Sequence, residues 1–145
     1  MYLSINMRSA NAYKTVGAEA GILGADAHQL IGLIFDAVLK SLRDAKAALQ
    51  VGDVLAKAQA ISRATRLIDE GLRSVLNDAG GGEIAANLSS LYDYSLQKLV
   101  EANIRSDVAL VEEVEKLFLP VVSAWSEIRP QVMGSGMNNP SQGRA

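Results

Sequence analysis

The chain has 145 residues, with 16 acidic and 14 basic side chains and a formal net charge of −2. This length favours one domain that can bury a core without metal or disulfide staples, and the lack of cysteine excludes disulfides and cysteine-ligated metals. Both signs of charge are scattered without a basic block, and no apolar run reaches membrane-spanning length, so we expect neither nucleic-acid binding nor stable membrane insertion.

The N-terminal residues lack the basic start and continuous apolar stretch of a secretory signal, so we expect a cytoplasmic protein. Residues 1–25 contain Gly17, Gly21 and Gly24 and are predicted to form an arm that is mobile when nothing is bound. Helical periodicity dominates residues 26–129, whereas residues 130–145 are rich in glycine, proline and amides and are predicted to be a disordered tail.

The first predicted helix runs from about Ala27 to Leu49, with Asp26 as its N-cap and Gln29 completing a capping-box-like pair. The second starts at Asp53, directly after Gly52. Both carry apolar residues at alternating spacings of three and four, which is typical of packed bundles. The predicted core positions are Leu30, Ile34, Val38, Leu42, Ala45 and Leu49 in the first helix, and Val54, Ala58, Ile61, Thr65, Ile68, Leu72 and Val75 in the second.

The third predicted helix runs from about Glu83 to Ile104, after a glycine turn, and the fourth starts at Ser106 or Asp107. Pro120 interrupts the fourth helix, but its apolar phase continues, so we expect a kink and not a stop. The predicted core positions are Ile84, Leu88, Leu91, Leu99 and Ala102 in the third helix, and Val111, Val114, Phe118, Val121, Trp125 and Ile128 in the fourth. Short connections make successive helices antiparallel neighbours, which predicts an all-α, up-down-up-down four-helix bundle.

His28 raises the alternative of a histidine phosphotransfer domain, because such domains are also four-helix bundles. The string from His28 to Gly32 resembles their motif, but Ile31 replaces its lysine and His28 lies in the first turn of its helix, where we expect it to be partly exposed. A di-iron site would need Glu-x-x-His pairs, which the chain lacks. Adjacent carboxylates such as Asp69 and Glu70 point about 100° apart on a helix and cannot share a substrate. We therefore predict no catalytic site, no cofactor and no metal.

The apolar surface exceeds what one packed helix face requires. Leu33, Phe35 and Leu39 fall outside the core stripe of the first helix, and Tyr92, Leu96 and Val100 flank that of the third. Apolar patches rimmed by polar groups are typical of protein-binding grooves. Alternatively, a broad bundle interior or the N-terminal arm covers these residues.

One segment runs from Asn87 through Tyr92 and Tyr94 to Asp107, and includes the sequence Leu99-Val100-Glu101-Ala102-Asn103. This segment resembles the longest motif of the flagellin-binding FliS family of flagellar export chaperones. The segment from Leu33 to Asp36 is similar to a motif on the family's first long helix, and Tyr13 is similar to its arm tyrosine. The resemblance covers residues 1–128, with departures at residues 31–33, Ala37 and Pro120.

The resemblance implies a cytosolic protein that binds the disordered C-terminal segment of flagellin, prevents premature polymerisation and delivers the subunit to the type III export gate. It also implies that the arm occupies part of the client surface when no client is bound, which makes Tyr13 a candidate self-occluding residue. The candidate flagellin-binding residues are Tyr13, Leu33, Phe35, Leu39, Tyr92, Leu96 and Val100. A self-associating bundle, in which a second copy covers the groove of a homodimer, remains a competing hypothesis.

Overall fold

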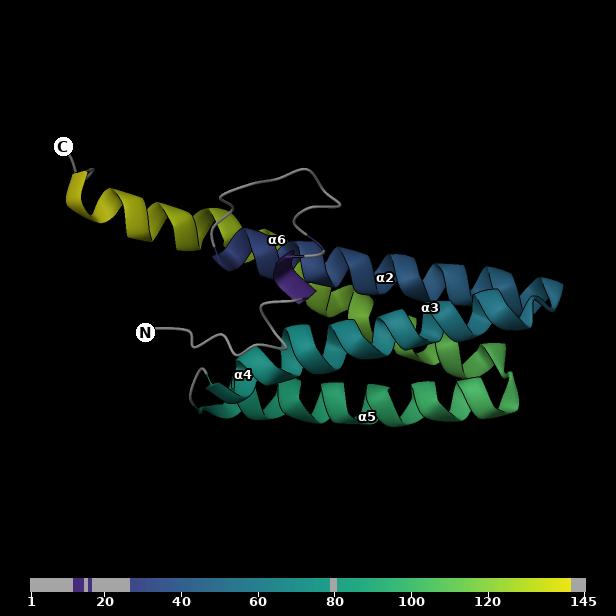
Figure 1. The fold of residues 1–145 in the computed structure, drawn as a ribbon. Helices are drawn as coiled ribbons and strands as arrows, with labels where there is room; N and C mark the ends of the chain where they lie inside the picture. Colours follow the sequence, from purple (N-terminus) through teal and green to yellow (C-terminus); the bar gives the residue numbers. More distant parts are fainter. Residues whose placement is uncertain (1–11, 15, 17–26, 79–80, 142–145) are drawn as a thin grey trace.

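The computed structural model describes the backbone of residues 12–14, 16, 27–78 and 81–141, and their side chains other than those of 77, 78 and 128–141. All elements in this part of the chain are helical (Figure 1). They are α2 (Ala27–Val51), α3 (Val54–Arg66), the π-helical segment η1 (Leu67–Arg73), α4 (Ser74–Asp78), α5 (Glu83–Arg105) and α6 (Val108–Ser141). Because α3, η1 and α4 follow one another without a break, they form the second predicted helix, and the predicted all-α bundle is confirmed.

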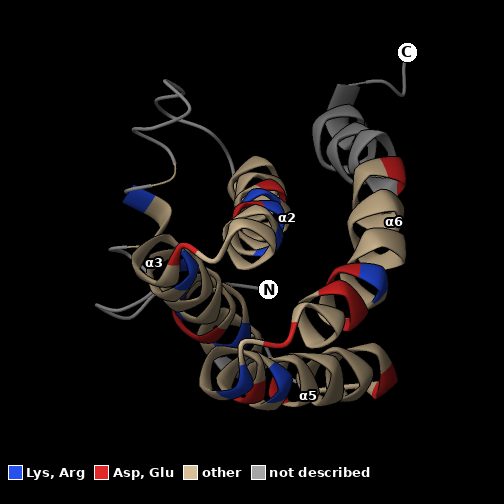
Figure 2. Cartoon of the chain, turned by 90° about the vertical axis from the view of Figure 1, so that its right-hand side faces the viewer, with Lys and Arg blue, Asp and Glu red and all other residues tan. Residues whose placement is uncertain are grey.

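Seen end-on, α2, α3, α5 and α6 surround a common interior (Figure 2). α2 packs against α3, η1 and α6, while α5 packs against η1 and α6. Helix α2 therefore has neighbours on more than one side, and it buries a wide apolar arc that includes Ile34, Phe35, Val38, Leu39 and Leu42.

The turns lie where the sequence predicts them. Gly52 adopts a positive φ of 74°, and the Asp53 carboxylate caps α3 by accepting a hydrogen bond of 3.0 Å from the Ala56 amide. Ser106 ends α5 with a φ of 52°, and Asp107 accepts a 3.0 Å bond from the Ala109 amide at the start of α6. The predicted cap Asp26 lies outside the described residues.

Polar side chains also connect the helices. The buried Lys57 ammonium donates to the Asn103 carbonyl and to the Ser106 hydroxyl, both at 3.0 Å, so a cation on α3 caps the C-terminal end of α5. Lys46 on α2 pairs with Glu115 on α6 at 2.8 Å. These contacts fix neighbouring helices in register at the end of the bundle that holds both turns.

Two of the predicted core positions are wrong, and another, Ile128, has a side chain outside the described part of the structure. Val54 is 69% exposed and Ile84 is 76% exposed. Val54 is the first residue of α3 and Ile84 the second of α5, so each lies at an end of the bundle, where the neighbouring helices offer little surface to cover it.

The final helix is longer than predicted. It continues through Pro120, as expected, but also through Pro130 to Ser141, where the composition predicted a disordered tail. Proline inside a helix removes one backbone donor and crowds the carbonyl four residues earlier, which favours a kink, but α6 continues past Pro120 and Pro130.

Candidate functional site

An apolar pocket of about 220 Å³ lies between four parts of the bundle and the N-terminal arm. Its walls come from α2, from η1 and α4, from α5 and from α6, and no lining residue carries a formal charge. The lining residues are Tyr13, Ile31, Phe35, Gly71, Leu72, Val75, Leu76, Leu88, Tyr92, Val121 and Trp125. Such a cavity favours an apolar occupant over a charged or strongly polar one.

The arm contributes one wall of this pocket. Tyr13 is only 7% exposed and Val16 only 5% exposed, so both side chains join the core. The Tyr13 hydroxyl donates a 2.8 Å hydrogen bond to the Gly71 carbonyl, and burial raises the pKa of this phenol to about 12. The arm is therefore docked at Tyr13 by apolar contact and by one buried polar contact.

The partner of Tyr13 lies within the π-helical segment. In η1 the backbone bonds reach five residues back, as the bond from the Ser74 amide to the Asp69 carbonyl shows. Single π-helical turns inside α-helices are rare and are common at functional sites. Here the irregular turn places Gly71 against the arm, at the edge of the apolar pocket.

Aromatic rings pack together next to the pocket, and three of them, Phe35, Tyr92 and Trp125, also line it. Phe118 on α6 is fully buried, stacks on Tyr92 with ring centroids 6.2 Å apart, and meets Phe35 edge-on at 6.4 Å. Trp125 meets Phe35 at 6.0 Å. These pairs join α2, α5 and α6, so the rings are part of the hydrophobic core.

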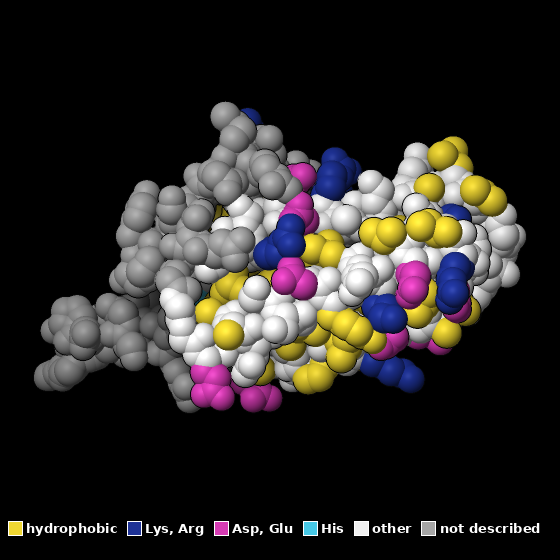
Figure 3. All heavy atoms as spheres, turned by 90° about the horizontal axis from the view of Figure 1, so that it is seen from below, with side chains coloured by type: hydrophobic (Ala, Val, Ile, Leu, Met, Phe, Trp, Pro, Cys, Tyr) yellow, Lys and Arg dark blue, Asp and Glu magenta, His cyan; other side chains and the backbone are white. Residues whose placement is uncertain are grey.

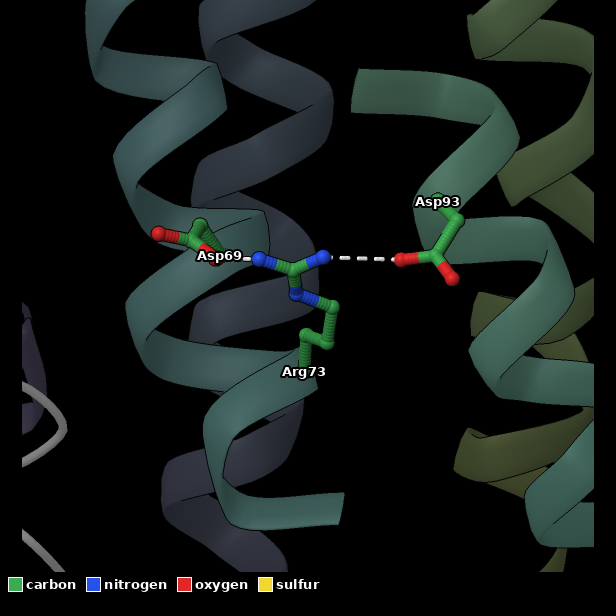
Figure 4. A network of polar contacts seen from close by, with 3 residues as sticks. All are labelled: Asp69, Arg73 and Asp93. Carbon is green, nitrogen blue, oxygen red and sulfur yellow. Dashed lines mark hydrogen bonds and ion pairs between the residues drawn. The ribbon is translucent and has the colours of Figure 1, made fainter. Parts of the chain in front are cut away.

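A charged network spans the rim of the site. Arg73, the last residue of η1, forms ion pairs with Asp69 on its own segment and, at 2.8 Å, with Asp93 on α5 (Figure 4). Hydrogen bonds to Asp93 and Asp69 raise the pKa of the Arg73 guanidinium. Since Leu72 precedes Arg73 and Tyr92 precedes Asp93, this bridge connects two walls of the pocket.

A stripe of apolar residues continues along α5 beyond the pocket. Leu96 is half-buried, while Val100 is 55% and Ile104 is 79% exposed, and the three follow Tyr92 at steps of four residues. Residues four apart lie next to each other along a helix. We call Leu96, Val100 and Ile104 the α5 stripe. Apolar side chains lie among charged ones on the face of the molecule to which α5 belongs (Figure 3).

The structure corrects part of the predicted surface. Phe35, Leu39 and Tyr92 are at most 5% exposed, so the interpretation of these residues as uncovered apolar surface is wrong. The bundle interior covers them because α2 and α5 each have several packed neighbours. Phe35 and Tyr92 nevertheless line the pocket, while Leu39 does not.

Of the remaining candidates, Tyr13 is buried in the pocket wall, and Leu96 and Val100 belong to the α5 stripe. Leu33 lines a second pocket of about 180 Å³ between α2 and α6, which shares Phe35 and Trp125 with the first but has a more polar wall. The site thus unites Tyr13, Phe35 and Tyr92, extends to Leu96 and Val100, and leaves Leu33 and Leu39 outside.

Sequence reasoning missed Gly71, the π-helical turn and Arg73, because hydrophobic periodicity does not show a one-residue change in helical hydrogen bonding. It also missed a cluster of exposed apolar residues at the opposite end of the bundle. Val51 and Leu55 are 78% and 68% exposed, beside the turn that starts at Gly52.

His28 is buried and not partly exposed as predicted. Its ring stacks on Trp125 at a centroid distance of 4.2 Å with an interplanar angle of 10°, and the Trp125 indole donates to the His28 carbonyl at 3.2 Å. A histidine covered in this way is poorly placed to accept phosphate from another protein.

No group of three or more potential metal ligands occurs among the described residues, and none of the helices they form is long and apolar enough to cross a bilayer.

The fold and the pocket place this protein among small helical bundles that present an apolar surface next to a docked arm. Residues 9–132 match the family model described as flagellar protein FliS. The flagellar secretion chaperone FliS of Salmonella typhimurium is 44% identical over 83% of this chain and 89% of its own length. Those of Escherichia coli (FliS) and Pseudomonas aeruginosa (FliSB) are 36% and 38% identical, over 83% and 84% of this chain and 88% and 96% of their own lengths. The chain belongs to the FliS family of flagellar secretion chaperones.

Proposed function

We propose that this protein binds the C-terminal segment of flagellin in the cytoplasm and has no catalytic activity. Binding would keep the subunit from polymerising prematurely and hold it ready for the flagellar type III export gate. The observation that carries the proposal is the apolar pocket behind Tyr13, together with the exposed α5 stripe, which follows the pocket residue Tyr92 along the same helix in steps of four residues. An amphipathic helix could place one apolar residue in the pocket and further residues along the stripe.

The energetics suit a client that is disordered before it binds. Such a segment loses conformational entropy when it folds and recovers free energy by burying its apolar face. The α5 stripe offers apolar surface that is still exposed, while the pocket offers surface that the arm now covers. The proposal therefore includes a change in the chaperone as well as folding of the client.

The arm is proposed to compete with the client for the pocket. Tyr13 already occupies one wall of the pocket, and its hydroxyl is held by the Gly71 carbonyl. Among the described arm residues, displacement breaks the hydrogen bond from Tyr13 to Gly71 and exposes the Tyr13 and Val16 side chains, a modest change compared with unfolding a helix of the bundle.

The test is co-purification with full-length flagellin and with flagellin lacking its C-terminal segment, followed by calorimetry with the isolated segment. We expect a complex of about one to one that requires the segment, and a large negative heat-capacity change. A complex that survives the truncation would refute the proposal. Light scattering over a range of concentrations separates this proposal from a homodimer, because a second copy that always covers the α5 stripe would leave no site for the client.

A further inference from the structure

The side of α3 that is turned toward α5 carries its own row of uncharged residues, Val54, Ala58 and Thr65. We propose that this row and the α5 stripe, together called the α3–α5 surface, form a second docking surface for the C-terminal segment of flagellin. An amphipathic helix of the segment lies along this surface while another part of the same segment fills the pocket behind Tyr13. The proposal rests on the function proposed above, because it concerns the same client.

Contacts at the start of α3 show which of its sides is turned toward α5. Val54, Lys57 and Ser106 line one small pocket, and the Lys57 ammonium donates to two acceptors at the end of α5. At 3.6 residues per turn, positions 54, 58 and 65 lie within roughly 40° of one another around the helix axis. Ala58 and Thr65 therefore share the side of α3 on which Val54 lies.

The α5 stripe lies on the side of α5 that is turned toward α3 and η1. Asp93, three residues before Leu96, pairs with Arg73 at the end of η1 (Figure 4). The next residue, Tyr94, points to α6 instead, where its hydroxyl donates to Glu113. Residues three and four apart are neighbours on a helix, so the stripe continues the side marked by Asp93. Since α3 and α5 pack against each other, their two rows run next to each other toward the turns at the end of the bundle.

Most of the apolar side chains on this surface are uncovered. Val54 and its neighbour Leu55 are exposed, as are Val100 and Ile104 on the opposite row, and Ala58 is half-buried. Apolar side chains are visible at the end of the bundle where α3 begins and α5 ends (Figure 3). Neither row contains a charged residue, so a partner that covers them buries hydrocarbon without removing water from a charge.

The backbone of this surface determines the form of its occupant. All elements of the described chain are helical, so α3 and α5 pair their own amides and carbonyls and offer no edge to which a strand binds. The occupant must satisfy its own backbone while it buries apolar side chains, which an amphipathic helix does. Leu96 and Ile104 are eight positions apart on α5, which corresponds to about 12 Å, or about two turns of a client helix.

The size of the surface favours a client that is already anchored nearby. A stable independent interface typically involves about 20–30 residues on each side, far more than the two rows provide. A segment held in the pocket has a high effective concentration at a neighbouring surface, so a weak additional contact is enough to bind it there. Tyr92 of the pocket wall is one helical turn from Leu96, which puts both sites within reach of one client chain.

The test compares Ala58→Arg with Gln59→Arg. Both variants add the same charge to α3, but Gln59 is exposed and points about 100° away from Ala58. The arginine at position 58 would lie between the two rows, so the dissociation constant of the flagellin C-terminal segment should rise roughly tenfold. The helicity that the segment gains on binding, measured by circular dichroism, should also fall. Gln59→Arg should change neither quantity.

Val54→Glu is a second variant that separates binding from folding. Val54 is the first residue of α3, where a carboxylate interacts favourably with the helix dipole, so stability in urea should not fall. The same carboxylate must lose water when a client helix covers it, so the affinity for the segment should again fall roughly tenfold.

Four outcomes would overturn the inference. If Ala58→Arg and Val54→Glu bind the segment as tightly as Gln59→Arg does, the client does not touch α3, and the proposed function stands. Tighter binding by Ala58→Arg would assign the surface to terminal residues of the chain itself. A dimer in light scattering that Val54→Glu dissociates, with unchanged affinity for the segment, would assign it to a second copy. If the segment does not bind the unaltered protein, the proposed function fails as well.

Discussion

Replacing Val100 by aspartate should weaken client binding without unfolding the bundle. Val100 is 55% exposed, so about half of its side chain is left for a client to bury. Complete burial of such a side chain contributes about 1.5–3 kcal/mol, so the lost apolar contact is worth about 1 kcal/mol. Partial desolvation of the new carboxylate raises the expected loss to about 2–3 kcal/mol, which corresponds to a dissociation constant roughly 30- to 150-fold higher.

The neighbouring residue provides a matched contrast. Leu99 is fully buried, so Leu99→Asp would place a carboxylate in the core and lose the burial of a leucine. That combined cost approaches the roughly 5–15 kcal/mol that stabilises a typical domain, and the protein should unfold. Ser90→Asp adds the same charge at an exposed position of α5 and should change neither property.

The assay pairs circular dichroism in urea with fluorescence titration of a labelled flagellin C-terminal segment. The expected pattern is native stability with weak binding for Val100→Asp, loss of helicity for Leu99→Asp, and normal behaviour for Ser90→Asp. Unchanged affinity of the Val100→Asp protein would refute the assignment of the α5 stripe to the client site.

The remaining predictions concern the arm and the core. Removing residues up to Thr15 should raise client affinity roughly fivefold if the arm only occludes the pocket, and lower it if Tyr13 closes over the bound client. Tyr13→Ala should reproduce most of either effect. Equal dissociation constants for the full-length, truncated and Tyr13→Ala proteins would exclude a role for the arm. Ile68→Asp should unfold the bundle because Ile68 is fully buried. Leu33→Asp should fold, and it should bind the client with near-normal affinity because Leu33 does not line the pocket behind Tyr13. Equal loss of helicity in both variants would place Leu33 in the core. Docking of the arm should weaken as the pH rises from about 10 through 12, because the docked Tyr13 phenol has a pKa of about 12 against an ordinary value of 10.0 and loses its proton more easily once the arm is free. The titration of tyrosinate absorbance should therefore differ between the intact and Tyr13→Phe proteins in this range. Identical titrations would contradict the prediction.

The sequence predicts most of the bundle because its helices are amphipathic and their turns have distinctive residues. Asp53 and Ser106 lie at helix ends, and the fully buried Ile34, Ile68 and Phe118 all belong to the predicted stripes. Helical periodicity cannot say how many neighbours a helix has. For this reason the apolar pattern predicts Phe35 and Leu39 as surplus surface, although α2 buries them against more than one partner.

The site was harder to predict than the fold. Tyr92 is predicted from the apolar flank of the third helix and Tyr13 from its resemblance to the family's arm tyrosine. The contact that holds Tyr13, however, depends on a backbone carbonyl, which every residue possesses. The π-helical turn that presents Gly71 involves a single extra residue per turn, and the apolar pattern of Ile68, Leu72 and Val75 passes through it unchanged. Arg73 and Asp93 are 20 residues apart, so only the tertiary fold brings their charges together.

A chaperone that stores an apolar pocket must keep it covered without closing it permanently. An open pocket would expose the free protein to non-specific association. A cover built from a complete helix of the bundle could leave only at the cost of global unfolding. Tyr13 provides a smaller cover, since it contributes one buried side chain to the pocket wall and donates one hydrogen bond to the Gly71 carbonyl. The bridge from Arg73 to Asp93 does not involve the arm, so it can keep η1 and α5 together while the arm leaves. The pocket can therefore exchange its occupant while its walls stay in place.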